Sequence, residues 1–189
     1  SRTKAPLKHQ RLDVFPLKKL TRRPNPSYTL ESFIPIQGFN QQAYGAVTSF
    51  LDSNSLLLEP GLFLWGDKGV GKTHLLHDTA NEFLTSFSGG VFLGNPDTFN
   101  LLFNESQRLG MKYNDANRLL EQRMIEVGLL GIDSLDELNH GQRTHELLDK
   151  VLKARCDDGK RTIFTSNVPP ENGKFGRFNS DSRTRLRGR

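Results

Sequence analysis

A glycine-rich octapeptide, residues 66–73, constrains this chain more than any other feature. It reads Gly-Asp-Lys-Gly-Val-Gly-Lys-Thr and fits the pattern G-x-x-x-x-G-K-[ST] at every fixed position. The apolar run Gly61–Trp65 precedes it, and a helical pattern follows from about Gly71 to Phe87. Glycines let the backbone curl until successive N–H groups point at phosphate oxygens, and the helix presents its positive end to the same anion. The sequence therefore predicts a phosphate-binding loop between a buried strand and a helix.

The expected ligand of this loop is ATP with Mg²⁺. We expect Lys72 to reach the β- and γ-phosphates and the Thr73 hydroxyl to bind Mg²⁺. A second Mg²⁺ ligand is expected where another apolar run, Val127–Ile132, leads into Asp133, which would bind the ion directly or through water. The predicted cofactor-binding residues are Gly66, Asp67, Lys68, Gly69, Val70, Gly71, Lys72 and Thr73, and the predicted metal ligands are Thr73 and Asp133.

The position after Asp133 departs from the pattern of a fast hydrolase. Hydrolases of this class usually carry a second acid there, which polarises the attacking water, but Ser134 occupies the position. Asp136 and Glu137 follow and are either solvated loop residues or a substitute for the missing acid. We therefore expect nucleotide binding, with ATP hydrolysis that is slow.

Asn167 is a further candidate site residue. It follows the apolar run Thr162–Thr165, and ligands of parallel α/β sheets bind at the carboxyl ends of the strands. An amide at that place could orient water or the γ-phosphate. The alternative is a turn-forming role ahead of the Val-Pro-Pro sequence at 168–170.

Strand and helix patterns alternate along the chain. Expected strands are residues 61–65, 90–93, 127–132 and 162–165, and expected helices are residues 40–51, 71–87, 97–109, 115–126 and 142–156. Asn40 is the expected N-cap of the first of these helices. This alternation predicts an α/β fold of the P-loop NTPase type, a parallel sheet flanked by helices on both faces.

Charge separates the ends of the chain from its body. Residues 1–23 have a net charge of +7, residues 174–189 have +5, and the body between them has −7. A basic end can meet nucleic acid or an acidic partner, or can be a solvated leader. Four prolines (Pro6, Pro16, Pro24 and Pro26) break any helix near the start, so residues 1–27 are predicted to be a basic, flexible leader and residues 28–189 the core. The lone Cys156 and the lack of a long apolar run lead us to expect a cytoplasmic protein.

Several strings resemble AAA+ ATPases of bacterial replication. Asn25–Phe33, Leu62–Gly66 and Gly71–His77 look like the replication initiator DnaA and its regulatory paralogue Hda. Thr162–Asn167 looks more like the helicase loaders DnaC and DnaI and the IstB-type transposition helpers. The ending Arg185–Arg189 resembles the arginine-rich box of DnaA.

This resemblance extends over residues 25–189 and implies roles for individual positions. Residues near Tyr28–Ile36 would line the adenine pocket, and Asn167 would be sensor 1. Arg189 would be an arginine finger inserted into the ATP site of a neighbouring subunit, with Arg185 in support, although a basic tail is the plainer interpretation. The implied catalytic set is Lys72, Asp133, Asn167 and Arg189.

The function implied is an ATP-dependent switch in DNA replication, initiator-like or helicase-loader-like. Expected partners are further copies of the chain, a replicative helicase or initiator protein, and single-stranded DNA. The alternatives are an Hda-like regulatory module with weak hydrolysis, which Ser134 favours, and an IstB-type transposition ATPase. The chain ends without the helical lid usual in the family, so we expect an AAA+ core whose lid subdomain is absent, either a fragment or a naturally short form.

Overall fold

The computed structural model describes residues 20–38, 40–52, 61–138 and 142–170. Its elements are α2 (Gln41–Leu51), β1 (Gly61–Trp65), α3 (Lys72–Ser86), β2 (Val91–Gly94), α4 (Pro96–Arg108), α5 (Tyr113–Glu126), β3 (Leu129–Ile132), η1 (Leu135–Glu137), α6 (Gln142–Asp157) and β4 (Arg161–Ser166). The predicted strands and helices are confirmed, with bounds that agree to within one or two residues. No helix in the described part of the chain is both long enough and apolar enough to span a membrane.

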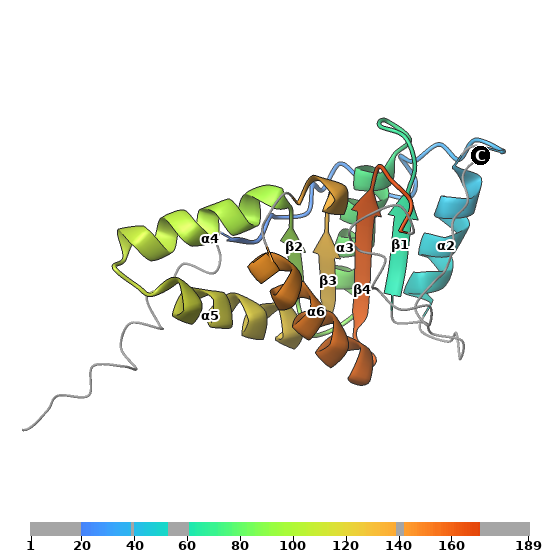
Figure 1. Ribbon diagram of the computed structural model, residues 1–189. Coiled ribbons are helices and arrows are strands. Elements are labelled where there is room, and N and C mark those ends of the chain that lie inside the picture. The colour runs from blue at the N-terminus through green and yellow to red at the C-terminus, as the bar shows by residue number, and fades with distance from the viewer. Residues whose placement is uncertain (1–19, 39, 53–60, 139–141, 171–189) are drawn as a thin grey trace, which may run out of the picture.

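The four strands form one parallel sheet in the order β1-β4-β3-β2. Helices α2 and α3 cover one face of the sheet, and α4, α5 and α6 cover the other (Figure 1). Neighbouring residues of one strand serve opposite cores: Leu129 packs with α2 and α3, whereas Leu130 packs with α4, α5 and α6. Burial on both faces explains why the strands are continuously apolar, and it confirms the predicted fold class.

The chain joins the domain earlier than the boundary at residue 28 that the sequence suggested. The Leu20 side chain is buried in the core with α4 and α5. The Leu93 N–H donates to Thr21 Oγ1 at 3.0 Å, and the Arg22 N–H donates to the Leu93 carbonyl at 2.8 Å. Residues 20–22 therefore lie along β2, so this part of the predicted leader belongs to the packed domain. The rest of the proposed leader, residues 1–19, lies outside the described residues.

Asn40 occupies the N-cap position of α2, but its side chain does not cap the helix as predicted. Its Oδ1 atom instead accepts a hydrogen bond from the Ile36 N–H at 2.6 Å. The local bond to the preceding turn competes with capping, a choice that short amide side chains often have. Asn40 thus fixes the loop that enters α2.

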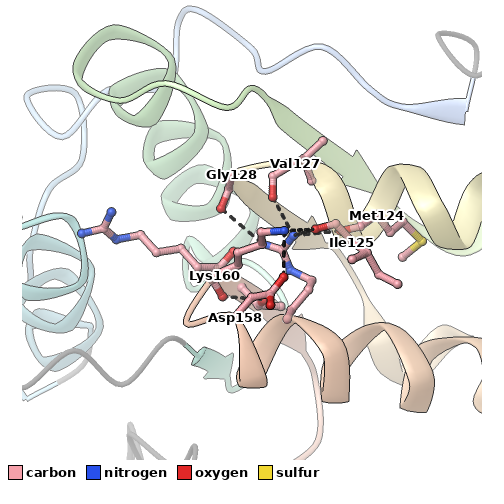
Figure 2. Close-up of polar contacts among 9 residues, drawn as sticks. Met124, Ile125, Val127, Gly128, Asp158 and Lys160 are labelled. Carbon is pink, nitrogen blue, oxygen red and sulfur yellow. Dashed lines mark hydrogen bonds and ion pairs between the residues drawn. The ribbon is translucent and has the colours of Figure 1, made fainter.

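A buried arginine holds the amino-terminal ends of β3 and β4 to the end of α5. Arg155 of α6 is 1% exposed and donates to the carbonyls of Met124 at 2.8 Å, Val127 at 2.7 Å and Gly128 at 3.2 Å. It also donates to the carbonyl of Arg161 at 2.5 Å. The carbonyl groups of Met124, Val127 and Gly128 converge on this point (Figure 2). Burial lowers the Arg155 pKa to about 10, so the guanidinium stays charged while it donates to these carbonyls.

Candidate nucleotide-binding site

The predicted phosphate loop connects the carboxyl end of β1 to the first turn of α3. The Gly66 N–H donates to the Ser166 carbonyl at 3.3 Å, which fastens the start of the loop to the end of β4. Gly71, just before α3, has φ +98, and a methyl group there would lie 2.6 Å from a ring carbon of Phe33. Only glycine suits both that backbone conformation and that ring. The first N–H groups of a helix have no partner within it, so those of α3, next to the loop, are suited to bind phosphate.

Lys72 lies across this loop. Its Nζ atom donates to the carbonyls of Gly66 and Asp67, each at 2.7 Å. Partial burial lowers the Lys72 pKa, and the carboxylates of Asp136, Asp133 and Asp67 act in the opposite direction. The remaining predicted loop residues, Lys68, Gly69 and Val70, lie in the turn between Asp67 and Gly71.

The two predicted metal ligands lie together at the carboxyl end of β3. Thr73 Oγ1 donates to Asp133 Oδ1 at 3.1 Å and lies 3.3 Å from Oδ2, while Thr165 Oγ1 donates to Asp133 Oδ1 at 2.5 Å. Asp133 is only 8% exposed, so these hydroxyl groups are what satisfies its carboxylate. A hydroxyl and a carboxylate beside a phosphate loop are hard oxygen donors, the set that Mg²⁺ prefers. The residues present therefore fit Mg²⁺.

Asp136 turns back toward the site instead of remaining in a solvated loop. Ser134 is in the left-handed conformation, with φ 54, and its N–H donates to Thr165 Oγ1 at 2.8 Å. The short helix η1 follows and brings Asp136 against Asn167. The Asn167 backbone N–H donates to Asp136 Oδ1 at 2.9 Å, and Asn167 Nδ2 donates to Oδ2 at 3.0 Å. Sequence reasoning left Asp136 open as a loop residue, and the structure makes it the partner of Asn167.

Glu137 does not join this cluster. The Glu137 side chain is 51% exposed, and its Oε1 lies 3.9 Å from the Nζ of the exposed Lys68. Glu137 therefore fits the solvated-loop interpretation. Arg189, the predicted arginine finger, and its supporting Arg185 lie outside the described residues.

The segment Tyr28–Ile36 lies beside the amino-terminal half of α3. The Tyr28 ring stacks on His74 with ring centroids 4.6 Å apart, and Phe33 packs edge-on against the same imidazole at 5.3 Å. His74 Nε2 also lies 3.1 Å from the Thr29 carbonyl. The segment is therefore fixed next to the phosphate loop, where the resemblance expects the adenine pocket. Its outer side carries apolar Ile34, which is 77% exposed.

Sequence reasoning missed two residues of α3 that hold this segment. The Asn25 N–H donates to His77 Nδ1 at 3.0 Å, and Asn81 Nδ2 donates to the carbonyls of Asn25 at 2.8 Å and Tyr28 at 3.1 Å. The spacing of four residues between His77 and Asn81 places both side chains on one helical face. That spacing was the available signal, but it did not reveal that the partner groups are backbone atoms about fifty residues away.

Comparison with known proteins identifies the family of this chain. The family model described as the bacterial DnaA ATPase domain matches residues 24–188, which is most of the 189-residue chain. The chain belongs to this family. The DnaA replication initiator of Clavibacter sepedonicus is 27% identical over 151 residues, which are 79% of this chain and 30% of that protein. The chain thus spans less than a third of the length of that DnaA.

Solved structures agree with the family assignment. A replication initiator DnaA bound to AMPPCP and single-stranded DNA has a TM-score of 0.68 and 28% identity, covering 80% of this chain and 45% of that one. The DnaC helicase loader has a TM-score of 0.59 and 19% identity, covering 83% of this chain and 85% of that one, and at this identity it shows the fold alone. The chain therefore carries a DnaA-like ATPase domain with the AAA+ fold.

Proposed function

We propose that this domain binds Mg-ATP and acts as an ATP-dependent switch in DNA replication, in an initiator-like or helicase-loader-like module. The observation that carries the proposal is the hydrogen-bonded cluster of Thr73, Asp133 and Thr165 beside the phosphate loop. It unites a loop for phosphate and a hydroxyl–carboxylate pair for Mg²⁺ at one edge of a parallel sheet, the edge where such folds bind ligands. The AMPPCP in the DnaA structure supports a nucleotide as the ligand.

Each residue of the site would have a distinct task. Lys72 now donates to two loop carbonyls, and it would donate to phosphate oxygens when ATP binds. The Thr73 hydroxyl and Asp133 carboxylate would hold Mg²⁺, which neutralises charge on the β- and γ-phosphates. Thr165 would keep Asp133 oriented. Asn167 would orient the γ-phosphate or the attacking water at the end of β4.

ATP would act as a switch by completing contacts between subunits. In this proposal, Arg189 of one copy reaches the γ-phosphate of the next, supported by Arg185, so that self-association depends on ATP rather than ADP. The partners proposed are a replicative helicase or initiator protein and single-stranded DNA. The DnaA structure that contains single-stranded DNA supports the latter.

An Hda-like regulatory module is the second candidate. The position after Asp133 is held by Ser134, in a left-handed turn and without a carboxylate. Such a module would retain nucleotide, hydrolyse it weakly and act through protein contacts. ATP turnover separates the two candidates, because only the first requires hydrolysis as the step that resets the switch.

Binding of ATP with Mg²⁺, measured by calorimetry, tests the proposal with two lysine variants. Lys72→Ala should weaken binding by about 10-fold to 100-fold, because one charge-assisted hydrogen-bond donor to phosphate is lost. Lys68→Ala is the matched control, since that side chain is 83% exposed in the same loop, and it should bind like the unmodified chain. Equal affinity in both variants would refute the phosphate-binding role of Lys72, and no binding by the unmodified chain would refute nucleotide binding.

The mass of the assemblies that the protein forms in solution tests the proposed switch. Mass photometry with ATP, with ADP and without nucleotide should show larger assemblies with ATP alone. Arg189→Ala should abolish that increase without changing the affinity for ATP. Assemblies that are indifferent to the nucleotide would contradict the switch and leave the nucleotide-binding proposal standing.

A further inference from the structure

The residues after β3 form a turn that brings a carboxylate back against the end of β4. Ser134 takes the left-handed conformation, and η1 follows at once. Leu135 and Leu138, on either side of the acidic pair, are buried in the core at 0% and 3% exposure. Anchored at both ends, the turn fixes Asp136 at the end of β4 and leaves Glu137 toward solvent.

The Asp136 carboxylate is positioned by two hydrogen bonds from one residue. Both donors belong to Asn167, one from its backbone at 2.9 Å and one from its amide at 3.0 Å. Asn167 in turn follows directly on β4. The charge of Asp136 also reaches the phosphate loop, because among the acids that raise the Lys72 pKa it has the largest effect. Asp136 therefore lies against Asn167 at the end of β4, and its charge acts on Lys72 of the phosphate loop.

Among the described residues, the other acids near the loop are not placed to polarise water. Asp133 lies with the Thr73 hydroxyl and is assigned to Mg²⁺, so its carboxylate is committed to the metal. The Glu137 side chain is half-exposed, next to Lys68. Asp67 is exposed, and its carbonyl accepts from Lys72. Within the described part of the chain, Asp136 is the acid that remains.

We propose that Asp136, three residues beyond Asp133, supplies the water-polarising carboxylate that Ser134 cannot, acting on a water held jointly with Asn167. This inference rests on the proposed binding of ATP. In the step, the water oxygen forms a bond to the γ-phosphorus while the bond from that phosphorus to the β–γ bridging oxygen breaks. One water proton passes to Asp136 and then to solvent, and the products are ADP and inorganic phosphate.

The test is ATP hydrolysis in a single turnover, with saturating Mg-ATP, with and without single-stranded DNA. Asp136→Asn should lower the rate by about 100-fold or more, the usual contribution of a positioned base. It keeps an oxygen for the Asn167 backbone N–H, and rotation of the Asn167 amide lets that amide oxygen accept from the new Nδ2 atom. ATP affinity should therefore stay unchanged, and the melting temperature should fall only slightly. Glu137→Gln, on the same turn, is the matched control and should hydrolyse ATP at the unmodified rate.

A second pair of variants at position 136 separates the effect of the negative charge from that of the side-chain shape. Asp136→Glu retains a carboxylate and Asp136→Gln does not, at equal side-chain length, so the Glu variant should hydrolyse ATP at least about 10-fold faster. This pair serves also if Asp136→Asn fails to fold. Equal rates within the pair, an Asp136→Asn rate equal to that of the unmodified chain, or an unmodified chain that binds ATP without hydrolysing it, would each overturn the role of Asp136. Failure of the unmodified chain to bind ATP would instead refute the proposed function.

Discussion

Asp78 of α3 is a buried carboxylate that costs the domain stability at neutral pH. It is 0% exposed, and neither of its oxygens has a hydrogen-bond partner among the described residues. Burial raises its pKa from 3.8 to about 6, and the nearby Glu82 adds to the rise. The Leu30 N–H and His74 offset it in part, although Leu30 does not reach hydrogen-bond geometry. Burial dominates because the groups facing Asp78 supply too little compensation.

The sign follows from the proton balance of folding. The folded-state pKa lies above the ordinary value, so the folded protein binds the extra proton between pH 3.8 and about 6. Below pH 3.8 the carboxyl is neutral in both the folded and the unfolded state, and its burial has the smallest cost. The unfolding free energy falls as the pH rises from 3.8 through about 6. A rise of this size corresponds to about 3 kcal/mol of unfolding free energy above pH 7, of which about 1 to 2 kcal/mol is lost between pH 5 and pH 8.

Asp78→Asn replaces the carboxylate by a neutral group of the same shape. Urea denaturation at pH 5 and pH 8 should show the variant gaining about 1 to 2 kcal/mol on the unmodified protein between the two values. Asp157→Asn, at an exposed position on α6, is the control and should show no such gain. If the unfolding free energies of Asp78→Asn and the unmodified protein differ by the same amount at pH 5 and at pH 8, the carboxylate is compensated in solution. That result would refute this reasoning.

Two further substitutions test the packing of the sheet by urea denaturation. Arg155→Met should lower the unfolding free energy by at least about 3 kcal/mol, because the buried carbonyls to which Arg155 donates lose that hydrogen-bond donor. The matched control Lys153→Met, at an exposed position, should change it by less than about 0.5 kcal/mol. Gly131→Ala should cost about 1 to 3 kcal/mol, since the added methyl would lie 2.5 Å from Leu93 Cδ2 and 2.8 Å from Leu76 Cδ1. Gly45→Ala in α2 has open space and should instead stabilise by about 0.5 to 1 kcal/mol. Equal effects of the two members of either pair would contradict the packing described.

The sequence by itself determined the layout of the fold and the centre of the site. The loop from Gly66 to Thr73 is a local motif whose glycines dictate backbone conformation, so its place between β1 and α3 was predictable. Asp133 and Asn167 were predictable for a related reason. Each follows an apolar strand, and parallel strands carry their carboxyl ends to one edge of the sheet. Periodicity then gave the helices, since burial on one face leaves a repeating apolar pattern.

Only the tertiary structure determined where the side chains of Asp136, Arg155 and Asp78 lie. Asp136 returns to the site because Ser134 adopts a left-handed conformation between buried residues. A serine in a sequence does not predict that conformation. Arg155 and Asp78 both read as ordinary helical charges. Their burial depends on carbonyls or apolar groups brought from distant parts of the chain. Spacing along a helix gives the face a residue lies on, but the free energy of a charge depends on what the folded chain places opposite it.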